Sequence, residues 1–134
     1  MKSLLTLSLL IALASCVSTI NSHRMKAAQR KMLETRTLQQ AGHWDEALAL
    51  AERMNSSVSK SIASDPIHRA AGGAKVDLRP LLAAWLNGPL KDLNAALQQK
   101  DSRRSTAAFA SLRQQCINCH TVIGKTQVQI PEIP

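Results

Sequence analysis

The sequence predicts an all-α protein that folds as an antiparallel up-down-up-down four-helix bundle. Ala, Leu, Gln, Lys and Arg dominate the composition, and these residues favour helices. The chain has one Phe, two Trp and no Tyr, which is too few large side chains for an ordinary β-sandwich. Four amphipathic stretches with short connections follow one another along the 134 residues. This length allows one domain.

The N-terminus has the pattern of a secretory signal over residues 1–15. A positive start precedes an apolar run at residues 4–13, which is too short for a stable bilayer-spanning anchor. The triplet Ala12-Leu13-Ala14 predicts cleavage after Ala14, whereas Leu13-Ala14-Ser15-Cys16 resembles a bacterial lipobox. The second pattern predicts a lipidated Cys16, which would use a thiol that the motif described below leaves over.

Four helices are expected in the remaining chain. Residues 16–22 are expected to form a short linker, and Ser22 to cap the first helix of a bundle over residues 23–134. The first helix should end before Gly42, and the second should run from near Trp44 to the Asp65-Pro66 pair. The helical spacing of three and four gives these helices one apolar face each, formed by Met25, Ala28 and Met32 in the first and by Trp44, Ala47, Leu48, Ala51, Met54, Val58 and Ile62 in the second.

The second half should contain the other two helices. A loop through Ala71-Gly72-Gly73 leads to a third helix that Asp77 can cap and that Asn87-Gly88-Pro89 should kink or split. A fourth helix is expected from near Asp101, with Phe109, Leu112, Cys116 and Cys119 at spacings of three and four. The tail beyond Thr121 should be extended.

Residues 116–120 form the motif that indicates a chemical function. Cys116-Ile117-Asn118-Cys119-His120 is C-x-x-C-H, the attachment signature of a c-type haem. At a helix end, the thiols of Cys116 and Cys119 can add to the two vinyl groups of one porphyrin, and His120 can bind the iron from the proximal side. The sequence therefore predicts one covalent haem c.

Two other uses of this cysteine pair stay open. A thiol-disulfide redox site would expect a βαβ scaffold, whereas the residues around the motif are helical in pattern. A structural zinc site would need a second ligand pair, and the sequence has no other Cys or His pair at metal spacing. The low aromatic content also favours haem, because a porphyrin would supply the large apolar body that the core lacks.

With the motif at the end of a fourth helix and a short tail behind it, the chain resembles the cytochrome c′ and cytochrome c556 family of small exported cytochromes. The resemblance is best over residues 85–134, and Gly42-His43-Trp44 is also similar to relatives of this type. The chain is shorter than cytochrome c′ between the first helix and the motif. The resemblance implies a bundle with haem attached to its last helix.

Candidates for the sixth, distal iron ligand follow from the bundle and the resemblance. The end of helix four should lie beside the beginning of helix one and the end of helix two. The family places its distal residue about three turns into the first helix, which selects Met32, with Met25 as a second candidate. The alternatives are an open iron or a histidine ligand, which could be His23, His43 or His68. Either methionine could also fill the core without binding iron.

Function and partners follow as expectations. The leading prediction is an electron carrier on the periplasmic side of a bacterial membrane, held there by lipid on Cys16, or otherwise in the soluble periplasm. The alternatives are a five-coordinate haem protein that binds nitric oxide or carbon monoxide, as the family resemblance implies, and a haem subunit of a larger oxidoreductase. No oriented nucleophile, carboxylate pair or phosphate loop is visible, so no enzyme is expected.

The net charge of the chain indicates which kinds of partner it can bind. The formal net charge is +8, from 17 Lys and Arg against 9 Asp and Glu, without a long basic run. An exported chain of this kind is not expected to bind nucleic acid. A redox partner with an acidic docking face is expected instead, and homodimerisation stays open.

Overall fold

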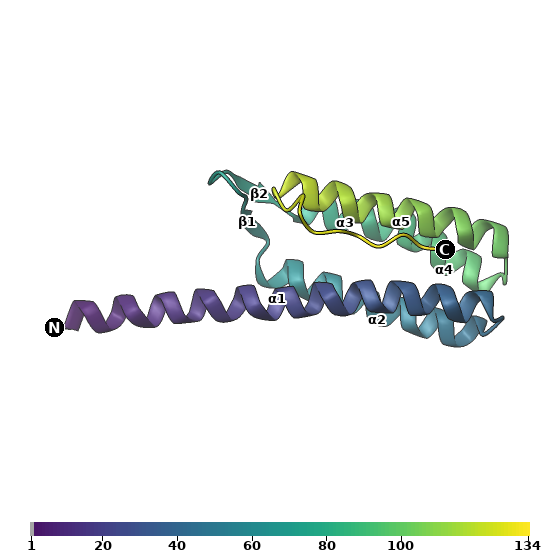
Figure 1. Ribbon diagram of the computed structural model, residues 1–134, viewed down its shortest axis with the longest axis horizontal. Coiled ribbons are helices and arrows are strands. Elements are labelled where there is room, and N and C mark those ends of the chain that lie inside the picture. Colours follow the sequence, from purple (N-terminus) through teal and green to yellow (C-terminus); the bar gives the residue numbers. More distant parts are fainter. Residues whose placement is uncertain (1) are drawn as a thin grey trace.

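The computed structural model describes the backbone of residues 2–134 and the side chains of residues 16–134. It is a mostly helical domain in which four helices pack antiparallel, the third being split in two (Figure 1). The signal predicted over residues 1–15 therefore lies, apart from its helical backbone, outside the described residues. The elements are α1 (Lys2–Gln40), α2 (Trp44–Ser64), β1 (Ile67–Arg69), β2 (Lys75–Asp77), α3 (Arg79–Asn87), α4 (Pro89–Gln98) and α5 (Ser102–Val122).

A tight turn joins α1 to α2 where the sequence predicts it. Gly42 has a φ of +79°, a conformation that Gly adopts without steric cost. The N–H of His43 then donates to the carbonyl oxygen of Leu38 at 2.9 Å, and α2 begins at Trp44. The two helices therefore pack along each other as a hairpin (Figure 1).

The expected linker at residues 16–22 is instead part of α1. No Gly or Pro interrupts the chain before Gly42, so nothing in the backbone stops the helix. The polar residue Asn21 is also held by the rest of the fold. Its Oδ1 accepts a hydrogen bond from Ser64 Oγ at 2.8 Å, and Arg24 Nη1 lies 3.3 Å from the same oxygen. This part of α1 is therefore fixed against the end of α2.

The loop expected after α2 contains a short antiparallel β-hairpin, an element that the all-α prediction lacks. Ile67–Arg69 pairs with Lys75–Asp77, with His68 opposite Val76. Gly72 and Gly73 have φ values of +91° and +89°, which allow the chain to reverse tightly between the strands. A three-residue strand is too short to give a clear alternation in the sequence.

The third helix breaks at Gly88-Pro89, as predicted, which gives α3 and α4. Asp77 accepts a hydrogen bond at the start of α3, since its Oδ1 lies 3.0 Å from the N–H of Arg79. The residue at the cap position is nevertheless Leu78 and not Asp77. Helix α5 starts near Asp101 as predicted, and Asp101 caps it, since its Oδ1 accepts from the N–H of Arg104 at 2.9 Å. Helix α5 then packs antiparallel on α4.

The C-terminal tail runs back between α1 and α5 (Figure 1). Arg113 of α5 donates to the carbonyl oxygens of Pro131 at 2.9 Å and Ile130 at 3.1 Å. From the other side, Arg36 of α1 donates to the carbonyl oxygen of Pro134. Ile130 thereby joins a core formed mainly by Met32, Met54, Trp85, Leu90, Leu93, Leu97, Phe109 and Leu112.

Candidate functional site

The C-x-x-C-H motif lies in the last two turns of α5. Phe109 and Leu112 are buried on the inner face of this helix. Cys116 and His120 follow at helical spacing on the same side, four residues apart. The helix closes directly after them, where the N–H of Lys125 donates to the carbonyl oxygen of His120 at 2.8 Å and Gly124 has a φ of +72°.

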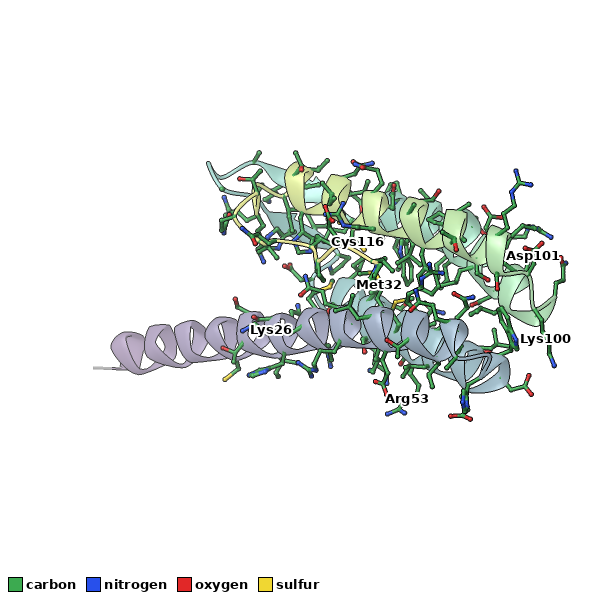
Figure 2. All side chains as sticks on the ribbon, turned by 45° about the vertical axis from the view of Figure 1, so that its right-hand side comes forward. Lys26, Met32, Arg53, Lys100, Asp101 and Cys116 are labelled. Atoms are coloured by element: carbon green, nitrogen blue, oxygen red, sulfur yellow. The ribbon has the colours of Figure 1, made fainter. Side chains whose placement is uncertain are left out.

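Cys116 and His120 face a cavity of about 40 Å³ inside the bundle. All four helices of the bundle and the tail contribute to its wall. In Figure 2, Met32 of α1 and Cys116 of α5 lie across from each other in the space between these helices. The lining residues are Met25, Ala28, Gln29, Met32, Met54, Val58, Trp85, Cys116, His120 and Ile130.

Cys119 lies beside this cavity and is not among its lining residues. It is half-buried and packs against a neighbouring apolar cluster formed by Ile62, Leu78 and Ile123. The two thiols therefore lie on adjoining sides of the end of α5. All three cysteines, including Cys16, are free thiols, and Cys16 is exposed on α1.

The structure brings both candidate methionines to the cavity. Met32 is 2% exposed, and Met25 lines the wall about two turns nearer the N-terminus. The histidine candidates lie elsewhere: His23 is exposed, His43 pairs with Glu46 at 3.0 Å, and His68 pairs with Asp65 at 2.5 Å. Among the candidates for a distal ligand, only the two methionines share the cavity with His120.

Three cavity residues were not singled out for the site by sequence reasoning. Met54 and Trp85, which the sequence places in the core, are 2% and 4% exposed and line the same space. Met54 lies in the middle of α2, so the rule that brings the end of helix two beside the motif does not select it. Ile130 comes from the tail, and no local pattern indicates that it folds back.

Two buried polar atoms at the cavity have no hydrogen-bond partner in the described part of the chain. They are Nδ1 of His120 and Nε1 of Trp85. Leaving such groups unsatisfied costs about 1–3 kcal/mol each. The hydrogen-bonding capacity of both lining side chains is therefore unused within the described residues.

Burial also sets the protonation states. It raises the pKa of Cys116 to about 11, with a smaller contribution from Cys119, and it raises the pKa of Cys119 as well. Burial lowers the pKa of His120, and the positive charge of Lys125 lowers it further. The imidazole is therefore neutral at pH 7, as a metal ligand must be. Among the described residues, no three His, Cys, Asp or Glu side chains gather as a cation site.

These residues fit a c-type haem in chemistry, and the cavity would have to enlarge to hold one. Two thiols and a neutral imidazole lie at one helix end, with the thioether of Met32 across an apolar space. A volume of about 40 Å³ holds a few water molecules, whereas a porphyrin is many times larger. Ile130 is the one lining residue outside a helix, so a shift of the tail would enlarge the cavity without unwinding a helix.

No helix in the described part of the chain is both long and apolar enough to cross a membrane. Comparison with protein-family models finds no matching family, and comparison with the curated proteins and with the solved structures finds no match either.

Proposed function

We propose that the protein is a monohaem c-type cytochrome that carries electrons on the periplasmic side of a bacterial membrane. The observation that carries this proposal is the shared cavity of Cys116, His120 and Met32. When bound, haem supplies one-electron chemistry at its iron. Cys116 and Cys119 would hold its edge, and His120 would bind the iron from α5. The family resemblance over residues 85–134 supports a haem attached at the end of α5, and the buried Met32 favours the electron carrier within that family.

The side chains around the cavity suit an electron carrier. Met32 is almost fully buried, and a thioether ligand stabilises the reduced iron relative to an open site. The remaining wall is largely apolar, which excludes water and limits the reorganisation that accompanies electron transfer. Cys16 is exposed on α1 and lies outside the cavity, so a lipid on it would anchor the protein without disturbing the haem.

The test is expression with and without a periplasmic haem-maturation system. The wild-type mass should increase by one haem, and the attachment should survive denaturation. Cys116→Ser/Cys119→Ser should lose the covalent haem, whereas the control Cys16→Ser should keep it. A bare polypeptide mass after expression with the maturation system would refute the proposal.

The spectrum of the ferric protein distinguishes the electron carrier from the gas-binding alternative. A low-spin spectrum with the long-wavelength band of Met–iron ligation supports electron transfer. A high-spin ferric spectrum with rapid carbon monoxide binding to the reduced form would favour gas binding instead. This measurement also identifies the state of the sixth coordination position.

A further inference from the structure

Basic side chains gather at the end of the bundle that contains the cavity. This end is formed by the middle of α1, the end of α2, the β-hairpin and the end of α5, and hydrogen bonds join its parts: Arg24 Nη1 donates to the carbonyl oxygen of Lys60, and the N–H of Ala71 donates to that of Ile123. We call its exposed cationic residues the basic end: Lys26, Lys60, Arg69, Lys75 and Lys125.

No acidic residue pairs with these five side chains. None of them forms a salt bridge within the described residues. The two acids nearby have other partners, because Asp65 is hydrogen-bonded to His68 and Asp77 is paired with Arg79 at 2.8 Å. Along α1, the first acidic residue is Glu34, which lies beyond Met32. The five basic side chains are therefore not paired with acids, although the Asp65 carboxylate lies at the same end.

The opposite end of the bundle has a mixed charge. It consists of the α1–α2 turn and the α4–α5 turn, where three acidic and three basic residues lie (Figure 2 labels Lys100 and Asp101 there). The charged residues at these turns are Asp45, Glu46, Lys100, Asp101, Arg103 and Arg104. The net charge of the molecule is thus concentrated at the end where the cavity lies.

Exposed apolar side chains lie at the same end. Ile67 on β1, Val122 at the end of α5 and Val128 in the tail are 45%, 50% and 37% exposed. Lys125 lies between the last two in the chain, and Lys75 is on the strand paired with β1. An apolar surface with a charged rim is the usual composition of a protein interface.

From this placement we propose that the basic end, with Ile67, Val122 and Val128, is the docking surface for an acidic electron-transfer protein. The inference rests on the proposed function. Electrons would cross at the end of the bundle that contains the cavity, and the basic side chains there, which have no acidic partner, would attract the partner protein to that end.

A protein partner fits better than a lipid surface. Helices that lie on membranes combine basic residues with exposed Trp, Phe or Leu along one face. Here Trp85 and Phe109 are buried, and the exposed apolar residues of α1 are the smaller Val17 and Ile20. The basic residues come from both sides of the bundle, with Lys26 on α1 and Lys75 on the hairpin next to α5. Such an arrangement does not form one amphipathic helix face.

The experiment compares two charge reversals that alter the net charge equally. Lys26→Glu/Lys75→Glu changes the basic end, and the control Lys100→Glu/Arg103→Glu changes the opposite end. The reduced haem-loaded proteins are mixed with ferricyanide, an anion that takes one electron from the protein and becomes ferrocyanide. At low ionic strength the first variant should react about tenfold more slowly than wild type, and the control within about twofold. High salt should remove the difference.

A second readout does not require haem. A fluorescein-labelled oligoglutamate peptide should bind wild type and the control, as judged by anisotropy, and should bind Lys26→Glu/Lys75→Glu much more weakly. Equal effects of the two reversals, in either readout, would overturn the docking surface and leave the cytochrome proposal intact. Protein without haem absorbance would overturn the cytochrome proposal, and this inference with it.

Binding to lipid is the competing outcome. Cys16→Ser protein is mixed with phosphatidylcholine vesicles that contain phosphatidylglycerol. Tight binding that Lys26→Glu/Lys75→Glu abolishes, together with an unchanged ferricyanide rate, would assign the basic end to the membrane and would refute a protein partner. Absence of vesicle binding supports the proposal.

Discussion

Arg36 and Pro134 are 98 positions apart in the chain, and Nε of the first donates to the carbonyl oxygen of the second at 2.6 Å. The same guanidinium donates to Gln39 at 2.6 Å and to Thr106 at 2.9 Å, and it lies over the ring of Phe109. Since Arg36 is only 9% exposed, one side chain joins α1, α5 and the tail inside the protein.

Arg36→Ala should therefore lower the free energy of unfolding by at least about 2 kcal/mol, because buried hydrogen bonds to a charged group are lost together. Urea denaturation of the haem-free protein measures this. The control Arg30→Ala removes an exposed arginine from the same helix and should change stability by less than about 0.5 kcal/mol. Equal effects of the two variants would show that the tail contacts contribute little.

The tail should respond to haem loading, because Ile130 occupies part of the cavity wall. In the haem-free protein, Ile130→Ala should lower the free energy of unfolding by about 2–4 kcal/mol, as a large-to-small core substitution does. In the haem-loaded protein the cost should be smaller, since the group would displace this side chain. Val128→Ala, at an exposed position of the same tail, is the control and should cost little in both forms. An equal cost of Ile130→Ala in both forms would mean that the tail keeps its place.

Acid should destabilise the haem-free protein through His120. Burial lowers the pKa of this residue below its ordinary value of 6.5 in the folded state. The unfolded chain therefore binds more protons as the pH falls through that value, and the free energy of unfolding decreases from neutral to acidic pH. His120→Gln should make this dependence shallower. Identical pH profiles for wild type and His120→Gln would contradict the assignment.

Cys16→Ser should move the protein from the membrane fraction to the soluble periplasm. The expectation comes from the lipobox pattern and from the exposure of Cys16 on α1. Stable anchoring needs more than one acyl chain, which the multiply acylated cysteine of a lipoprotein provides. Cys119→Ser, which affects the motif only, should stay in the membrane fraction. Wild-type protein that begins at Ser15 with an unmodified Cys16 would refute lipidation.

Most helix ends could be predicted from the sequence, because each end is determined by one or two neighbouring residues. Gly42 ends α1, the Asp65-Pro66 pair follows α2, Gly88-Pro89 splits the third helix and Asp101 caps α5. The continuation of α1 through residues 16–22 could not be predicted in this way. Polar residues there are as compatible with a linker as with a helix, and the contact of Asn21 with Ser64 is formed only by the folded chain.

The candidate site was predictable where helix periodicity and bundle topology determine it. Periodicity places Met32 and Cys116 on inner faces, and the topology brings these faces to the same end. Periodicity also places Cys119 on the inner face, whereas in the structure His120, which the motif identifies, lines the cavity and Cys119 does not. The position of Ile130 depends instead on hydrogen bonds from Arg113 to the tail, which no spacing in the sequence indicates. The unpartnered Nε1 of Trp85 also emerges only from packing, because a Trp in the core usually finds a partner for this atom.

Met32 should be the distal ligand of the haem-loaded protein. It is the candidate that combines 2% exposure with a place opposite Cys116 in the cavity, whereas Met25 lies about two turns nearer the N-terminus and is only partly buried. Met54 is equally buried but comes from α2. A thioether ligand favours the reduced iron, so its removal should lower the reduction potential. Met32→Ala should therefore lose the Met–iron band, show a lower potential and bind carbon monoxide when reduced.

The matched variants Met25→Ala and Met54→Ala remove a thioether from the same cavity. They should keep the Met–iron band and shift the potential less than Met32→Ala does. If Met54→Ala alone loses the band, the ligand comes from α2 and the assignment of Met32 is wrong. If wild type lacks the band, binds carbon monoxide rapidly and has the same potential as Met32→Ala, the iron has no methionine ligand and the protein binds gas instead.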